Sequence, residues 1–365
     1  MIEIKTGDCK TVLKTLDVNT FNTCVTSPPY WGLRDYGTGT WVGGDPNCPH
    51  KRTTKIGKTV ETITGHKAMH DQGNVVGDAI YKTRCPKCGA FRKDEQLGLE
   101  ETPEEYVENL VKVFREVWRV LREDGTVWLN LGDSYYNYRP GKGQYVPKQT
   151  VSKTRQDFPI EVGRRANKLK GLKEKDLVGI PWRVAFALQA DGWYLRQDII
   201  WHKPNPMPES VKDRCTKAHE YIFLLSKNKK YYFDNEAIKE PAKDWGTRDR
   251  SKGKYHNAGT GLSPHTGLSK SYPTKNKRSV WRVTNKPYKG AHFAVYPSDL
   301  IEPCILAGCP EGGHVLDPFG GAGTTAIVAD KNHRNCTLIE LNIKYASLAN
   351  DRCNISQSTP IKRKE

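Results

Sequence analysis

The sequence contains no unbroken run of about 18 apolar residues, the length that a membrane-spanning helix needs. Its first ten residues, MIEIKTGDCK, lack the basic and apolar regions of a secretory signal peptide. No internal repeat is visible along the 365 residues. The ten cysteines are scattered, mostly in apolar contexts, so we expect reduced thiols in a cytoplasmic protein.

Acidic residues are too few to balance the basic ones: 41 Asp and Glu stand against 58 Lys and Arg, a net charge of +17. Residues 142–175 hold 10 Lys or Arg against 3 Asp or Glu, and residues 239–289 hold 13 against 3, so the rest of the chain is formally neutral. Charge confined to two stretches predicts two surfaces shaped for a polyanion. Two solvated loops that happen to be basic are the alternative.

Strand-like apolar runs alternate with helix-like segments along the chain. This pattern predicts an α/β fold, with a mostly parallel sheet that is covered by helices on both faces. The seven strand candidates are residues 2–5, 22–26, 126–131, 194–201, 220–225, 314–317 and 336–340.

The clearest helix is expected from Pro103 to about Arg122. Thr102 and Glu105 form a capping box ahead of it, and apolar residues recur three and four positions apart along it. Four further helices are expected at residues 181–192, after 297, after 324 and at 343–352. Three segments fit neither pattern and are interpreted as insertions or mobile loops, namely residues 37–98, 139–176 and 240–285.

The first motif that carries chemistry is TSPPYW at residues 26–31, directly after an apolar strand. Pro28 and Pro29 keep the backbone extended and lack N–H groups, so carbonyls there can accept hydrogen bonds, as can the hydroxyl of Ser27. The ring of Tyr30 follows at once. Such a site suits an amino group on a flat base, which must be flipped out of a duplex to reach it. An ordinary Pro-Pro turn is the alternative.

The second motif is VLDPFGGAGTT at residues 315–325, a strand, a glycine-rich turn and a helix start. Glycines let the main chain approach a ligand that a Cβ would exclude. The spacing is not a regular G-x-G-x-x-G and no P-loop lysine follows, which weakens the case for nicotinamide or ATP. Asp317 suits an ammonium group, and Glu340, at the end of the next strand, suits ribose hydroxyls. Together these groups describe S-adenosylmethionine, with a generic βαβ unit as the alternative.

SPPY near the N-terminus and DPF-x-G-x-G-TT near the C-terminus together resemble the amino-methyltransferases of DNA, in the β-class order with the catalytic half first. The resemblance covers residues 1–36, 100–138, 178–236 and 290–353. It implies a Rossmann-like, circularly permuted, seven-stranded methyltransferase sheet whose last strand is antiparallel. It also implies S-adenosylmethionine as cofactor, double-stranded DNA as partner, and a restriction-modification role in a prokaryotic cell or phage-infected host. Whether a restriction enzyme accompanies the protein stays open.

The resemblance also implies roles for individual residues. At the target base, Ser27 and the Pro28 carbonyl would bind the amino group beside Pro29, and Tyr30 would stack on the ring. The cofactor would be surrounded by Asp8, His292, Phe293, Asp317, Phe319, Gly320, Gly321, Gly323, Thr324 and Glu340.

An exocyclic amine is a poor nucleophile because its lone pair is delocalised into the ring. Hydrogen bonds to Ser27 and the Pro28 carbonyl would favour a pyramidal nitrogen, and in-line attack on the methyl group would follow without a covalent enzyme intermediate. Methylation at cytosine C5 needs a Cys nucleophile instead. Cys304 follows a proline but lies in an apolar helix-like run, so we interpret it as a core residue. Within the family, SPPY favours N4 of cytosine, and N6 of adenine is the alternative.

The resemblance divides the chain into two halves with insertions. Residues 1–36 and 100–236 form the expected catalytic half, and residues 290–353 form the cofactor-binding half, followed by a polar tail at 354–365. An insertion fills residues 37–99. The basic region 237–289 falls between the halves, where the family has its target-recognition region. DNA contacts are expected there from Arg248, Arg250, Lys275 and Lys277.

The insertion carries a candidate metal site. Cys85-Pro-Lys-Cys88 is followed by glycine, the usual shape of a zinc knuckle, and Cys48 with His50 could complete four ligands. We therefore expect a structural Zn²⁺ ion, although His66 or His70 could replace His50, and two surface thiols in a loop are the alternative.

Two rival functions stay open at this point. A non-catalytic, zinc-containing nucleic-acid-binding protein would explain the charge but would leave both motifs as coincidences. A methyltransferase acting on RNA or protein glutamine would more usually carry NPPY, and Ser27 stands where that asparagine would be.

Overall fold

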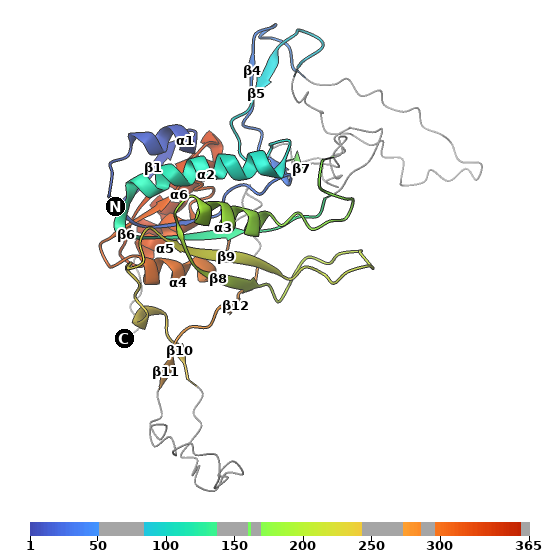
Figure 1. Ribbon diagram of the computed structural model, residues 1–365. Helices are drawn as coiled ribbons and strands as arrows, with labels where there is room; N and C mark the ends of the chain where they lie inside the picture. The colour runs from blue at the N-terminus through green and yellow to red at the C-terminus, as the bar shows by residue number, and fades with distance from the viewer. Residues whose placement is uncertain (51–83, 137–159, 162–168, 243–272, 286–295, 359–365) are drawn as a thin grey trace, which may run out of the picture.

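The computed structural model describes residues 1–50, 84–136, 160–161, 169–242, 273–285 and 296–358. These form one eight-stranded sheet with helices on both faces (Figure 1). Across the sheet the order is β1 (Ile2–Thr6), β14 (Asn335–Glu340), β13 (His314–Asp317), β2 (Phe21–Thr26), β6 (Leu121–Leu131), β9 (His219–Ser226), β8 (Tyr194–His202) and β12 (Val280–Arg282).

All seven predicted strands are present in this sheet. Strand β9 pairs antiparallel with β6 and with β8, whereas every other pairing in the sheet is parallel. Among the seven predicted strands, the reversed one is thus the last before the expected cofactor half. Strand β12 adds an eighth strand at the edge, which the sequence pattern did not indicate because three residues are too short for a period of two.

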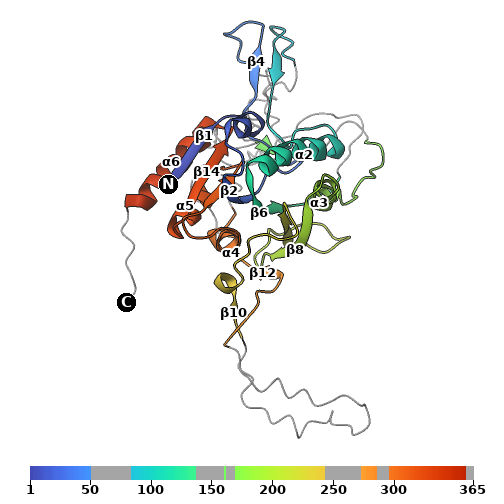
Figure 2. The same cartoon turned by 60° about the vertical axis from the view of Figure 1, so that its left-hand side comes forward.

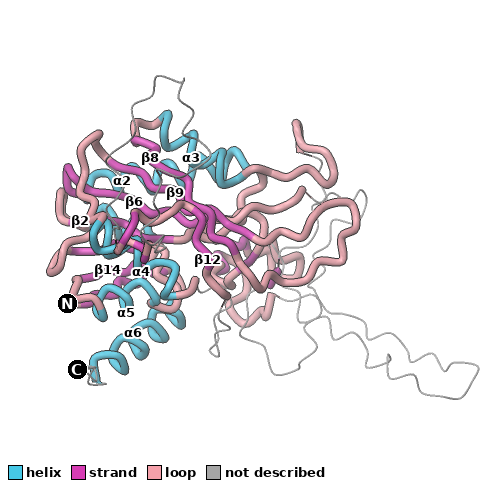
Figure 3. Tube along the Cα trace, turned by 90° about the horizontal axis from the view of Figure 1, so that it is seen from below, coloured by secondary structure: helices cyan, strands magenta, loops and turns pink. Residues whose placement is uncertain are grey.

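Helices α1 (Cys9–Val12), α2 (Pro103–Val120) and α3 (Ile180–Ala190) cover one face of the sheet. Helices α4 (Ser298–Gly308), α5 (Thr324–Lys331) and α6 (Ile343–Ser358) cover the other, as the view from below also shows (Figure 3). Successive strand residues face opposite sides, so Val127 and Leu129 join the first core while Trp128 joins the second. Cys304 lies buried in α4 within the second core, as predicted. Burial raises the pKa of its thiol.

The predicted capping box starts helix α2. The Thr102 hydroxyl accepts from the Glu105 N–H at 3.1 Å, and the Glu105 carboxylate accepts from the Thr102 N–H at 3.2 Å. The helix ends at Val120, slightly earlier than predicted, because Leu121 is already extended and enters β6. Strand β6 therefore begins five residues before the predicted start at Thr126.

Helix α6 continues to Ser358 and so enters the segment predicted as a polar tail. The sequence pattern ended this helix near Arg352, where the apolar residues cease to recur. A polar helix needs no apolar stripe to continue, and no glycine or proline follows until Pro360.

The predicted insertions contain short strands. Strands β4 (Thr40–Val42) and β5 (Phe91–Lys93) form an antiparallel pair that projects from the sheet, and β10 (Glu240–Pro241) and β11 (Thr274–Lys275) project at the opposite end (Figures 1 and 2). A further pair joins β3 (Arg34–Asp35) to β7 (Ile160–Glu161). Within the described ranges, no helix is long and apolar enough to cross a membrane.

Replacing Thr102 with Ala removes one half of the capping box of α2. We expect this change to lower the free energy of unfolding by about 1 kcal/mol, because a helical N–H loses its acceptor. Denaturant unfolding measures the effect. The exposed Thr284 provides a control, since Thr284→Ala should change stability by less than about 0.5 kcal/mol, and equal effects of the two changes would contradict the capping role.

Candidate functional site

Both sequence motifs lie at one edge of the sheet. Parallel strands place their carboxyl ends together, so Ser27 after β2, Asp317 at the end of β13 and Glu340 at the end of β14 meet there. Asp8 follows β1 at the same edge, where the N–H of Gly7 donates to the Glu340 carbonyl at 2.9 Å. The fold thus brings the two distant motifs into one site.

A buried carboxylate links the two motifs directly. Asp317 is 1% exposed, and its Oδ1 accepts from the Thr26 hydroxyl at 2.6 Å and from the Phe319 N–H at 3.0 Å. Its Oδ2 accepts from the hydroxyls of Tyr296 at 3.0 Å and Thr325 at 2.5 Å. Thr26 directly precedes Ser27, so these hydrogen bonds hold the first motif against the glycine-rich turn.

Burial and the four hydrogen-bond donors have opposite effects on the pKa of Asp317. Burial raises the pKa of its carboxyl, while the hydrogen bond from Thr26 opposes that shift. Burial also raises the pKa of Tyr296, and the charge of Asp317 adds to the increase, so the phenol stays protonated as a donor. All four donors come from the protein itself, and binding of an ammonium group by Asp317 stays a prediction.

The glycine-rich turn folds back onto the end of β14. The Gly321 N–H donates to Glu340 Oε2 at 2.8 Å, and the Asn342 N–H donates to Oε1 at 2.8 Å. The Gly320 N–H donates to the Ile339 carbonyl, and a Cβ at Gly320 would come within 2.9 Å of Leu338. These contacts fix the Glu340 carboxylate beside the turn.

The turn offers a polar group that no described residue satisfies. The Thr324 hydroxyl is buried and has no hydrogen-bond partner in the described ranges. It opens helix α5, directly after Gly323, whose φ of +81° requires glycine. An unpaired buried hydroxyl at the start of a helix, with a carboxylate nearby, fits the charged and sugar groups of a nucleoside such as S-adenosylmethionine.

The first motif presents Ser27 and Tyr30 as a hydrogen-bonded pair. The Ser27 hydroxyl donates to Tyr30 Oη at 3.3 Å, and Tyr30 Oη donates to Glu220 Oε2 at 2.8 Å. Asn130 Oδ1 lies 3.1 Å from the same phenol oxygen. Burial raises the pKa of Tyr30, and the charge of Glu220 raises it further.

Close packing fixes the ring of Tyr30 and the backbone beside it. A Cβ at Gly132 would lie 2.5 Å from Tyr30 Cε2, so only glycine leaves room for the ring. The Pro29 carbonyl accepts from the buried Tyr106 hydroxyl at 2.8 Å. No backbone group of the described chain donates to the Pro28 carbonyl.

The four predicted metal ligands meet in the projecting β4–β5 unit. The ligand atoms of Cys48, His50, Cys85 and Cys88 all lie within 4.8 Å of one another. Cys48 Sγ is 3.7 Å from Cys85 Sγ, and Cys88 Sγ is 3.5 Å from His50 Nδ1. The indole of Trp41 stacks on the His50 ring, with centroids 4.3 Å apart, and so orients it. Three thiols and an imidazole form the donor set of a structural zinc site.

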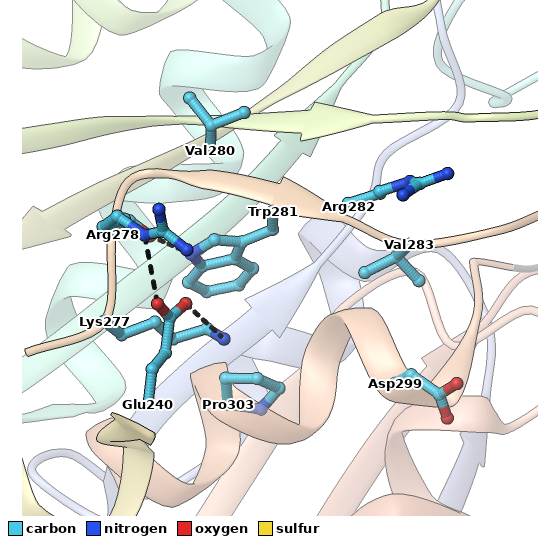
Figure 4. Close-up of a pocket in the computed structure, with 9 residues that line it drawn as sticks. All are labelled: Glu240, Lys277, Arg278, Val280, Trp281, Arg282, Val283, Asp299 and Pro303. Atoms are coloured by element: carbon cyan, nitrogen blue, oxygen red, sulfur yellow. Dashed lines mark hydrogen bonds and ion pairs between the residues drawn. The ribbon is translucent and has the colours of Figure 1, made fainter. Parts of the chain in front are cut away.

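The basic region is described only in part. Lys275 lies in β11, and Lys277 lies 3.8 Å from Glu240 and 5.0 Å from the centre of the Trp281 ring. Glu240 also pairs with Arg278 at 3.2 Å, so these cations are partly neutralised within the protein. Lys277, Glu240 and Trp281 border a cavity of about 260 Å³ between β12 and α4, whose lining contains no residue of the two motifs (Figure 4).

Several site residues could not be identified from the sequence. Asn130, Lys203 and Glu220 reach the site, although none belongs to either motif. Thr26 opens the first motif, but no sequence pattern indicated its contact with Asp317. For Glu220 there was one signal, a charged residue that opens an otherwise apolar strand candidate. Four residues predicted to contact cofactor or DNA lie outside the described ranges, namely His292, Phe293, Arg248 and Arg250.

Known proteins are similar to this chain in sequence and in fold. A family model described as DNA methylase, of the N6 and N4 type, matches residues 21–351. The type II methyltransferase M.SmaI of Serratia marcescens is 41% identical over 350 residues, 96% of this chain and 90% of the relative. M.Cfr9I of Citrobacter freundii, also a type II methyltransferase, is 39% identical over 351 residues, 95% of this chain and 85% of the relative.

Solved structures share the fold at low sequence identity. The PvuII DNA methyltransferase, named cytosine-N4-specific, has a TM-score of 0.53 and 15% identity, and the match covers 100% of this chain and 88% of that one. TTHA0409 of Thermus thermophilus, a DNA modification methylase in complex with S-adenosyl-L-methionine, has a TM-score of 0.51 and 20% identity, and the match covers 99% of this chain and 98% of that one.

Replacing Thr26 with Val tests the link between the motifs. The change removes a donor to a buried carboxylate, and we expect it to lower the free energy of unfolding by about 1.5–3 kcal/mol at neutral pH. The control is Thr126→Val, which removes a buried hydrogen bond between neutral hydroxyls and should cost about 0.5–1.5 kcal/mol. Denaturant unfolding compares the two.

The cost of Thr26→Val should also depend on pH. Thr26 stabilises the ionised form of Asp317, so the cost is largest at neutral pH and shrinks as acid protonates the carboxyl. Because burial raises the pKa of Asp317, this loss begins at a higher pH than for an ordinary Asp. A cost that does not change with pH would contradict this account of Asp317.

Proposed function

The chain belongs to the DNA methylase family, and from this premise we propose that it methylates N4 of a flipped cytosine in double-stranded DNA. S-adenosylmethionine supplies the methyl group as an electrophile on sulfur. The observation that carries the proposal is the hydrogen bond from Thr26 to Asp317, because it joins the SPPY motif to the glycine-rich turn. A base held at one motif then lies next to a cofactor held at the other.

On the base side, residues 1–36 and 100–236 provide the pocket. Ser27 Oγ and the Pro28 carbonyl accept hydrogen bonds from the amino group, which favours a pyramidal nitrogen with an available lone pair. The Pro28 carbonyl is suited to this, since no described backbone group donates to it. The ring of Tyr30, fixed by Gly132 and by its hydroxyl bonds, stacks on the base.

On the cofactor side, residues 290–353 provide the binding surface. Glu340 accepts from the ribose hydroxyls with the lone pairs that Gly321 and Asn342 leave available. The Thr324 hydroxyl gains the partner that it otherwise lacks among the described residues. Asp8 borders the adenosyl group from the end of β1, and Phe319 packs beside the turn.

Cytosine is favoured over adenine by the residue at the head of the motif. Within the family, SPPY is typical of enzymes acting on N4 of cytosine, whereas DPPY is typical of those acting on N6 of adenine. Ser27 is a neutral acceptor and is weaker than a charged carboxylate. Adenine N6 is the second candidate for the same site.

The basic region 237–289 supplies target recognition in this proposal. Its position between the two halves and its excess of Lys and Arg suit contacts with DNA phosphates. Lys275 and Lys277, with Arg248 and Arg250, are the proposed contacts. Relatives named as type II methyltransferases also suggest a restriction-modification setting.

The β4–β5 unit is proposed to hold a structural Zn²⁺ ion. Cys48, His50, Cys85 and Cys88 supply four ligands of the kinds that zinc prefers, and three sulfur atoms with one nitrogen form a closed structural set. With little core of its own, a two-stranded unit gains its stability from the metal.

The base is identified by incubating the protein with S-adenosylmethionine and unmodified DNA, then digesting the DNA to nucleosides for mass spectrometry. We expect N4-methylcytosine, and N6-methyladenine would contradict the cytosine assignment. Ser27→Ala should lower the methylation rate about 100-fold, the usual scale for losing one polar contact at a reacting group. Ser298→Ala, at an exposed serine of α4, is the control. Bound cofactor without any methylated base would point to a polymer other than DNA.

Metal analysis of protein purified without added zinc tests the proposed zinc site. We expect about one equivalent of zinc in the wild type and less than about half in Cys85→Ser, because a buried thiolate ligand is lost. Cys215 is an exposed thiol outside the cluster, so Cys215→Ser should keep the metal. A wild type with less than half an equivalent, or Cys85→Ser with unchanged zinc, would refute the site.

A further inference from the structure

Glu220 contacts the motif that binds the target base through the hydroxyl of Tyr30. Its side chain is 16% exposed, and Oε2 accepts the hydroxyl of Tyr30 at 2.8 Å. The other oxygen, Oε1, pairs with Lys203, whose side chain is also 16% exposed. Asn130 donates to Oε2 at 3.3 Å. A carboxylate so placed is one phenol away from Ser27.

The hydrogen bonds run in one direction, towards the carboxylate. An ionised carboxylate can only accept, so the Tyr30 hydroxyl must donate to Glu220. The phenol oxygen is then left to accept from the Ser27 hydroxyl, as observed at 3.3 Å. No described residue donates to the Ser27 hydroxyl, so its lone pairs can accept the N–H of a substrate amine. Glu220 therefore fixes, through Tyr30, the direction in which the Ser27 hydroxyl donates its hydrogen bond.

The reversed strand explains how Glu220 reaches this edge of the sheet. Glu220 is the second residue of β9, whose amino end lies where the parallel strands have their carboxyl ends. Gly132, just after β6, leaves the space, since a Cβ there would lie 3.3 Å from Glu220 Cδ and closer still to Tyr30. Lys203 follows β8 directly. Three adjacent strands thus build one acceptor beneath the Ser27–Tyr30 pair.

We propose that Ser27, Tyr30 and Glu220 form a proton relay that removes the proton released by methyl transfer. The inference rests on the proposed function. The amine nitrogen forms a bond to the methyl carbon as the carbon–sulfur bond breaks, and the electron pair stays on sulfur. The nitrogen gives its proton to Ser27 Oγ, the Ser27 proton passes to Tyr30 Oη, and the Tyr30 proton passes to the Glu220 carboxylate. Ser27 and Tyr30 end neutral, and Glu220 ends as a carboxylic acid beside Lys203.

Two cations interact with Glu220: Lys203 at the end of β8 pairs with Oε1, and Lys217 ahead of β9 interacts with it electrostatically. His219 is the preceding residue of β9 and lies against Tyr221, on the opposite face of the strand. The Lys217 amine is itself engaged, since it donates to the Asp133 carbonyl at 2.7 Å. Glu220 is a positioning residue in the resting site, because it touches Tyr30 and not the base.

The test compares Glu220→Gln with the wild type in single-turnover methylation of pre-bound DNA. Glutamine can still accept the Tyr30 hydrogen bond but cannot take up a proton, so we expect the rate to fall about 100-fold. Affinities for DNA and for S-adenosylmethionine, measured by binding without turnover, should stay unchanged. Glu302→Gln, at a glutamate paired with Lys331 at 3.1 Å on the far face, is the matched control.

Further variants separate a relay from a purely structural role. Tyr30→Phe keeps the ring but breaks the relay, and its loss should not add to that of Glu220→Gln in the double variant. Glu220→Asp keeps a proton acceptor and should recover at least about tenfold of the rate lost in Glu220→Gln.

The outcomes separate the relay from the proposed function. A wild type that methylates DNA while Glu220→Gln is equally fast would overturn the relay alone. So would Glu220→Gln and Glu220→Asp with the same rate loss as each other, because only positioning would then be lost. A wild type that binds cofactor and DNA yet forms no methylated base would overturn the proposed function and the relay with it.

Discussion

The site depends above all on the buried carboxylate of Asp317. Strands β2 and β13 are neighbours in the sheet, and a hydrogen bond between residues 291 positions apart in sequence, Thr26 and Asp317, joins their ends. A buried charge is costly unless it is surrounded by donors, and Asp317 has four. The donors come from β2, from the turn after β13, from α5 and from Tyr296 ahead of α4. Satisfying one carboxylate therefore fixes the relative positions of the base-binding and cofactor-binding motifs.

A second constraint is the reversal of one strand. Had β9 been parallel to its neighbours, Glu220 would lie at the far edge of the sheet, away from Ser27. Reversal brings its amino end to the carboxyl edge, where Lys203 neutralises it and Tyr30 donates to it. The same reversal leaves Ser27 as an acceptor. Sheet topology thus controls the hydrogen bonds of a serine that follows a different strand.

The two projecting strand pairs stand apart from this site. The β4–β5 unit with its cysteine and histidine cluster projects from one end of the sheet, and the β10–β11 pair projects from the other. Neither contributes to the two motifs in the described ranges. The solved methyltransferase structures share the fold of the sheet. The two projecting pairs are inserted in connections between its elements. Basic residues in these segments are partly neutralised, as Glu240 shows for Lys277 and Arg278.

The sequence by itself determined the sheet, most helices and the two motifs, because each depends on local patterns. Apolar runs marked seven strands, the Thr102 capping box marked the start of α2, and the glycines marked the cofactor turn. The spacing of Cys85 and Cys88 indicated a candidate metal site, and the fold gathers its four candidate ligand atoms within 4.8 Å. Only the tertiary structure decided that Asp317 is surrounded by protein donors and that Glu220 lies behind Tyr30. Such contacts join strands far apart in the chain, and no local pattern encodes which side chains will meet across a sheet.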